Sequence, residues 1–125
     1  MASSLNNLAV LYYAQGKHAE AEPLYQRALG IRESVLGAEH PDVAQSLNNL
    51  ANVYCAQGKY AEAEPRYQRA LTVWERALGP EHPNVASVLE NYAVLLRQTG
   101  RESQAAEMEA RAKAIRARHA SQRPS

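Results

Sequence analysis

The chain has 125 residues, a hydrophobic fraction of 46%, a charged fraction of 22% and a formal net charge of +1. These values are ordinary for one globular domain, and the near-neutral balance argues against a partner that is DNA or an anionic membrane. The single cysteine, Cys55, rules out a disulfide within the chain, and no stretch has the apolar length of a bilayer span or the pattern of a secretory leader. We therefore expect a cytoplasmic protein that binds neither nucleic acid nor membrane.

The sequence repeats with a period of 42 residues. Comparison of residues 5–37 with residues 47–79 finds 23 identical positions among 33, and a more divergent third copy follows. A fixed period of this length is typical of a solenoid, in which each unit buries its apolar face against the next. We expect one domain over residues 1–120 and a disordered tail at 121–125. The domain divides into units one, two and three, at about 3–40, 41–82 and 83–119.

Each unit is predicted to form two helices. In unit two, Leu47, Leu50, Ala51 and Tyr54 form the apolar stripe of an amphipathic helix. The second helix of this unit carries apolar residues at helical spacing as well, among them Tyr60 and Tyr67. Glycine residues mark helix ends, and a His-Pro pair precedes the first helix of units two and three, where proline favours a helix start. In chain order, the expected helices cover 3–15, 18–36, 41–57, a segment from Tyr60 to Gly79, 83–99 and 102–119.

Two prolines and the last helix depart from a uniform pattern. Pro23 and Pro65 lie inside second helices, where the loss of one backbone hydrogen bond predicts a bend and not a break. In the last helix, Glu109 and Lys113 replace apolar residues of the earlier units. One apolar stripe remains, which predicts a capping helix with one face on the stack and the other in water. Its members are Ala105, Met108, Ala112 and Ile115.

Several recurring segments carry a family resemblance. They are LNNLA and QGKYAEAEP within residues 47–71, the RAL that follows them, and the HPDVA linker. These segments resemble the tetratricopeptide repeat, and the 42-residue period is similar to its kinesin light chain type. The resemblance covers residues 3–118 and implies an all-α, right-handed α-α superhelical solenoid of three helix pairs with a C-terminal capping helix. It also implies a non-catalytic scaffold that binds a partner peptide or helix in a concave groove formed by the first helix of each repeat.

The first helices present a second face beside their apolar stripe, and this face is the candidate groove. Its asparagine amides both donate and accept hydrogen bonds, so they can pair with a ligand backbone without reading its side chains. In unit two the candidate residues are Gln45, Asn48, Asn52 and Cys55, flanked by Asn49. The equivalent residues are Ser3, Asn6, Val10 and Tyr13 in unit one, and Ser87, Glu90, Val94 and Arg97 in unit three.

The internal repetition sorts these positions into two kinds. Asn7, Asn49 and Asn91 are the same in every unit, which favours hydrogen bonds between repeats or to helix ends over ligand contact. The sets 6/48/90, 10/52/94 and 13/55/97 differ between units. Differences at one structural position are where partner specificity can be encoded, and solvated surface is the alternative explanation.

Charge in the candidate groove is sparse. One subclass of the repeat grips a C-terminal carboxylate with basic residues on its first helices, but Asn48, Ser87 and Asn91 stand at those places here. Arg97 adds a positive charge and Glu90 opposes it. The sequence therefore predicts a mixed or mildly polar peptide ligand.

Other residue types give no chemical site. His40 and His82 lie a full repeat apart beside helix-starting prolines, which favours a structural linker over a metal site. Cys55 is expected to be an inert thiol, and no nucleophile–base arrangement is recognisable. We expect no catalytic residue, no metal and no cofactor.

Two alternatives to a peptide-binding scaffold remain open. In unit one, Leu5, Leu8 and Tyr12 have no preceding helix to cover them, so the chain could self-associate as a structural solenoid. It could also be a regulatory fragment of a larger signalling protein.

Overall fold

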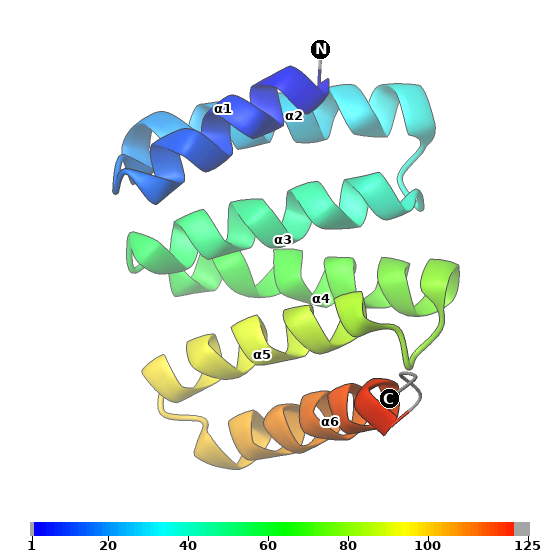
Figure 1. Ribbon diagram of the computed structural model, residues 1–125. Helices are drawn as coiled ribbons and strands as arrows, with labels where there is room; N and C mark the ends of the chain where they lie inside the picture. Colours follow the sequence, from blue (N-terminus) through cyan, green and yellow to red (C-terminus); the bar gives the residue numbers. More distant parts are fainter. Residues whose placement is uncertain (1, 122–125) are drawn as a thin grey trace.

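The computed structural model describes residues 2–121, and within this range every regular element is an α-helix. The helices stack as three consecutive pairs, from α1 and α2 at one end to α5 and α6 at the other (Figure 1). None of them combines the length and apolar character needed to cross a membrane, within the described residues. The helices are α1 (Ala2–Ala14), α2 (His18–Leu36), α3 (Pro41–Ala56), α4 (Tyr60–Leu78), α5 (Pro83–Gln98) and α6 (Glu102–Ser121).

These bounds confirm the predicted helix pairs, and local chemistry explains where the helices begin and end. His40 caps α3, because its ring Nδ1 accepts the backbone N–H of Asp42 at 3.0 Å, and Pro41 is the first helical residue. His82 caps α5 in the same way through Asn84. Both histidines therefore act as helix caps, which agrees with the structural role that the sequence favours. Within the described residues, no three His, Cys, Asp or Glu side chains are grouped so that they could hold a metal ion.

The glycine of a turn and the prolines inside two helices also follow the sequence. Gly58 lies in the α3–α4 turn at φ +77°, a conformation that glycine adopts without strain. α2 and α4 each run through a proline, Pro23 and Pro65, without a break. The bend expected near these prolines stays a prediction.

Alanine at the helix crossings lets each pair pack closely. Five of these alanines are at most 1% exposed. They are Ala9, Ala51 and Ala93 on the first helices and Ala21 and Ala63 on the second helices. Larger residues such as Leu50, Val53 and Leu95 fill the space between units and are also at most 1% exposed. Burying a leucine side chain of this kind stabilises the fold by roughly 1.5–3 kcal/mol. The core is thus continuous from unit to unit.

The last helix caps the stack as predicted. Ala105, Ala112 and Ile115 are buried and Met108 is half-buried against the core, whereas Glu109 and Lys113 are exposed. Ser121, expected in the tail, is the last residue of α6. The rest of the expected disordered tail lies outside the described residues.

Candidate functional site

Side chains from all three units meet in one pocket of about 310 Å³. Tyr13 comes from α1, Asn52 and Cys55 from α3, and Asn91 and Val94 from α5. A smaller pocket of about 170 Å³ lies next to it and shares Tyr13 and Asn52. The other residues of this smaller pocket are Val10, Tyr25 and Asn49. Seven of the sequence-predicted groove residues therefore line these two pockets, which we call the groove pockets.

The larger groove pocket combines apolar walls with unused amide groups. The hydroxyl of Tyr67 donates a hydrogen bond to Asn52 Oδ1, which leaves the Asn52 NH₂ group without a partner among residues 2–121. The NH₂ group of Asn91 donates to Asn48, and its carbonyl oxygen accepts no hydrogen bond within the same range. Val94 is 57% exposed and Tyr13 is 36% exposed. A ligand could thus bury an apolar group and pair its own polar atoms with Asn52 and Asn91.

Residues of the second helices also contribute to this pocket, and sequence reasoning missed them. Tyr60 and Tyr67 of α4 line it together with Gln98. Both tyrosines belong to the apolar stripe of their helix, so the pattern assigned them to the core alone. The available signal was the hydroxyl of Tyr67, because a buried tyrosine hydroxyl needs a hydrogen-bond partner and Asn52 is the partner it finds.

Cys55 is a half-buried thiol that lies beside Tyr67. Burial raises the pKa of Cys55, and the hydrogen bond to Tyr67 only partly offsets this effect. A thiol is reactive as the thiolate, so a raised pKa lowers its reactivity at neutral pH. Burial raises the pKa of Tyr67 as well, and it raises the pKa of Tyr25, the equivalent residue of unit one, to about 12. These groups are neutral at physiological pH.

Two predicted groove residues, Asn6 and Asn48, are buried and not available as a free groove surface. They are 7% and 8% exposed. Asn49 donates to the side-chain oxygen of Asn6 at 3.3 Å, and Asn91 donates to that of Asn48 at 3.2 Å. The amides therefore form one rung between each pair of neighbouring units. This arrangement supports the interpretation that the repeated asparagines join repeats, and Asn7 is the one without such a rung in the described residues.

The charges expected in the groove are bound within the chain. Arg97 pairs with Glu102 and Glu109 of α6. Arg116 of α6 donates to both carboxylate oxygens of Glu90, at 2.7 and 2.8 Å, and to the hydroxyl of Ser87 at 3.2 Å. These hydrogen bonds hold the pKa of Glu90 below its usual range. Neither Arg97 nor Glu90 presents a free charge, which corrects the expectation that they oppose each other in the groove.

Gln45, the remaining predicted residue, is also engaged by the chain. Its side-chain oxygen accepts a hydrogen bond from Arg32 at 3.0 Å. Arg32 is 7% exposed and the same nitrogen donates to Ser46 Oγ and to the backbone carbonyl of Asp42. Gln45 therefore helps to satisfy a buried guanidinium between α2 and α3.

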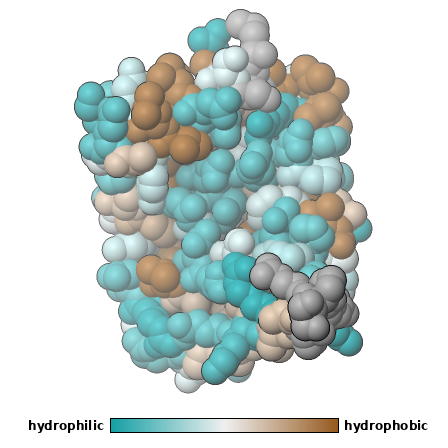
Figure 2. Space-filling view, viewed as in Figure 1, coloured by the Kyte–Doolittle hydropathy of each residue, from teal (hydrophilic) through white to brown (hydrophobic). Residues whose placement is uncertain are grey.

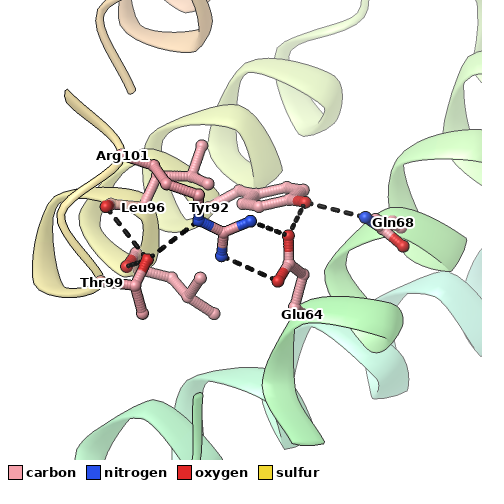
Figure 3. Close-up of polar contacts among 7 residues, drawn as sticks. Glu64, Gln68, Tyr92, Leu96, Thr99 and Arg101 are labelled. Atoms are coloured by element: carbon pink, nitrogen blue, oxygen red, sulfur yellow. Dashed lines mark hydrogen bonds and ion pairs between the residues drawn. The ribbon is translucent and has the colours of Figure 1, made fainter. Parts of the chain in front are cut away.

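A polar network joins units two and three (Figure 3). Arg101 donates to both oxygens of Glu64, at 2.9 and 2.8 Å. The hydroxyl of Tyr92 donates to Glu64 at 2.6 Å and accepts from Gln68 at 2.9 Å. The guanidinium of Arg101 and then the Tyr92 hydroxyl hold the pKa of Glu64 below its usual range. Burial and the adjacent carboxylate raise the pKa of Tyr92 to about 12. The network fixes α5 against α4 and so fixes the relative position of the groove residues.

Comparison with known proteins identifies the class. A family model described as tetratricopeptide repeat matches residues 1–71 and residues 42–118, so the chain belongs to the tetratricopeptide repeat family. Members of this family are typically non-catalytic scaffolds for protein–protein interaction. The confirmed resemblance extends to the kinesin light chain type of repeat.

Solved structures and one curated protein are similar to the chain. BtubC (BKLC) from P. vanneervenii superposes with a TM-score of 0.88 at 33% identity, over 94% of this chain and 46% of that chain. A putative kinesin light chain from Podosopora anserina with nearly identical TPR-like repeats gives a TM-score of 0.83 at 28% identity, over 92% of this chain and 55% of that one. A nucleotide-binding leucine-rich repeat (NLR)-like protein from Hyaloscypha variabilis is 47% identical over 38 residues, which are 30% of this chain and 4% of that protein.

Proposed function

We propose that the chain is a non-catalytic interaction module whose groove pockets bind a partner peptide in an extended or helical conformation. The observation that carries the proposal is the larger groove pocket, because it gathers residues that vary between units from three different helices. Family membership supports a protein partner, and the pocket supports a particular chemistry for that partner.

The ligand that fits this pocket is an uncharged segment with one bulky apolar side chain. The walls offer Tyr13 and Val94 for apolar contact. The free NH₂ of Asn52 and the free carbonyl of Asn91 offer one donor and one acceptor for a peptide backbone. A charged anchor would enter a site whose nearby Arg97 and Glu90 are already neutralised by α6. Affinity would therefore come from apolar burial and amide hydrogen bonds.

The test is a peptide-library selection followed by affinity measurement on two matched variants. Val94→Glu places a charge at the pocket wall, whereas Val35→Glu makes the same change at an exposed valine of α2 outside both groove pockets. We expect the selected peptides to share an apolar residue and to bind the Val94 variant at least about 10-fold more weakly, a loss of roughly 1.4 kcal/mol. Equal affinity for both variants would show that the peptides bind elsewhere, and a selection without enrichment would contradict the proposal.

A further inference from the structure

The units are joined by side-chain contacts that repeat with the period of the sequence. The amide rung between Asn6 and Asn49 recurs between Asn48 and Asn91. In each rung, the later unit supplies the donor and the earlier unit supplies the acceptor.

Two ion pairs follow the same rule. Lys59 pairs with Glu22 at 3.3 Å, and its equivalent Arg101 pairs with Glu64 at 2.8 Å. Arg69 pairs with Glu33 at 3.0 Å, and its equivalent, Arg111, pairs with Glu75. Each interface between units therefore has a positive side on the later unit and a negative side on the earlier one.

Unit one carries the donor half of all three contacts on its outer side. Asn7, Lys17 and Arg27 stand 42 residues before Asn49, Lys59 and Arg69. All three are exposed, and none makes a hydrogen bond or ion pair with a side chain of residues 4–120; Lys17 lies over the ring of Tyr12, at 5.7 Å. A further, more exposed ion pair also recurs, as Arg76 with Glu39 and Arg118 with Glu81, but unit one lacks its donor half because Ser34 occupies the equivalent position.

Two leucines on the same side of unit one are exposed, although the equivalent residues of later units are buried. Leu8 is 41% exposed, whereas its equivalent in unit two, Leu50, is 1% exposed. Leu11 is 52% exposed, whereas its equivalents Val53 and Leu95 are fully buried. Hydrophobic side chains gather at this end of the molecule, while hydrophilic ones cover most of the middle of the face seen in Figure 2. The outer side of unit one therefore exposes the same kinds of side chain that are buried between units elsewhere in the molecule.

We infer that this outer face of unit one, formed by Asn7, Leu8, Leu11, Lys17 and Arg27, docks a further helix pair of the same repeat type. The matching surface carries an amide acceptor and two carboxylates, at the positions that Asn6, Glu22 and Glu33 occupy in unit one. The interface is separate from the groove pockets and does not depend on their function.

The opposite end of the molecule cannot supply that surface. The positions equivalent to Asn48, Glu64 and Glu75 are Glu90, Ala106 and Ala117. Glu90 is already bound by Arg116, and alanine offers no acceptor. Head-to-tail stacking of two copies would therefore leave Lys17 and Arg27 unpaired. A two-fold contact between two outer faces would set these cations against each other, because like charges at close range repel.

The test is a chain in which residues 1–42 are duplicated in tandem, so that the added copy precedes Met1 with the native spacing. Amide hydrogen exchange reports on α1 in the original and the extended chain. We expect the α1 amides to be protected at least about 10-fold more strongly in the extended chain, because docking converts an end unit into an internal one. Unchanged exchange in α1 would overturn the inference.

Charge reversal separates specific docking from the general benefit of an added repeat. Lys17→Glu with Arg27→Glu should leave the thermal midpoint of the original chain unchanged. In the extended chain, the same double substitution should remove part of the rise in thermal midpoint that the added copy brings. Glu22→Lys with Glu33→Arg in the added copy should restore it. Equal effects of the reversal in both chains would contradict the inference. Sedimentation supplies the remaining check, since a concentration-dependent dimer of the original chain that protects α1 would assign this face to a second copy instead.

Discussion

The repeated asparagines allow a test of the interface between units with three equivalent residues in one molecule. Asn49 and Asn91 each donate to a buried amide of the preceding unit, whereas Asn7 has no such acceptor among the described residues. Replacing Asn49 or Asn91 by alanine should destabilise the fold, and the same replacement of Asn7 should not. The sequence around the three residues is nearly the same, so helix propensity changes equally in all three variants.

The expected magnitude follows from the geometry. The two hydrogen bonds are 3.3 and 3.2 Å long, at the long end of the range for N–H···O contacts, and a neutral bond of this kind contributes about 0.5–1.5 kcal/mol net. The acceptors left behind, on Asn6 and Asn48, are 7% and 8% exposed, so water compensates them poorly. We therefore expect Asn49→Ala and Asn91→Ala to lower the free energy of unfolding by about 1–2 kcal/mol each, or the midpoint by roughly 3–8 °C.

The assay is urea unfolding followed by far-ultraviolet circular dichroism at constant protein concentration, with Asn7→Ala as the matched control. The control should lie within about 0.5 kcal/mol of the parent chain, as is usual for exposed positions. If Asn7→Ala were as costly as the other two, the asparagines would act within their own helix, and the interface argument would be refuted. Neutral behaviour of all three variants would refute it as well.

Four further outcomes follow from the structure. Leu50→Ala should cost about 2–5 kcal/mol in chemical denaturation, while Leu8→Ala, at an exposed equivalent, should cost less than about 1 kcal/mol; similar costs would contradict the difference in burial. Glu64→Gln should lower stability at pH 7 by about 1 kcal/mol. Because the folded pKa of Glu64 is depressed, this stability is present above the unfolded pKa and is lost as the pH falls through the folded pKa, so the unfolding free energies of parent and variant should converge at acidic pH. His82→Ala should cost about 0.5–1 kcal/mol in thermal unfolding and His82→Asn much less, since asparagine can also cap α5; equal losses would exclude a capping role. Cys55 should react with iodoacetamide at least about 3-fold more slowly than free cysteine at pH 7.4 and become fully reactive in urea, and fast labelling of the native chain would contradict the raised pKa.

The sequence predicted the helices closely because three copies repeat the same local signals. The start of α3 and of α5 falls at the proline of a His-Pro pair, and each copy carries its glycine at the same turn. The capping role of α6 could be predicted as well. Glu109 stands where units one and two have Tyr25 and Tyr67, and a charged residue at that position indicates a helix face in contact with water.

The groove was predicted less completely, because a helical wheel does not show which helix packs over a given face. Asn48 and Asn52 lie one turn apart on α3, yet Asn48 is buried under the next unit and Asn52 faces the larger groove pocket. The partners of Arg97 and Glu90 lie on α6, and contacts of Arg116 with Glu90 across 26 residues have no signal in local spacing. Tyr67 was assigned to the core correctly, but its hydroxyl also reaches the pocket.

The two kinds of position in the repeat have different physical roles. Residues that recur between units, such as Glu22 with Glu64 and Asn49 with Asn91, make contacts between units, and those contacts need the same geometry at every step. Residues that differ, such as Tyr13 and Cys55 at one equivalent position, line the larger groove pocket. A substitution at the second kind of position changes the surface offered to a ligand at little cost in stability. A substitution at the first kind changes the alignment of the helices that form the groove, so its effect on binding would be accompanied by a loss of stability.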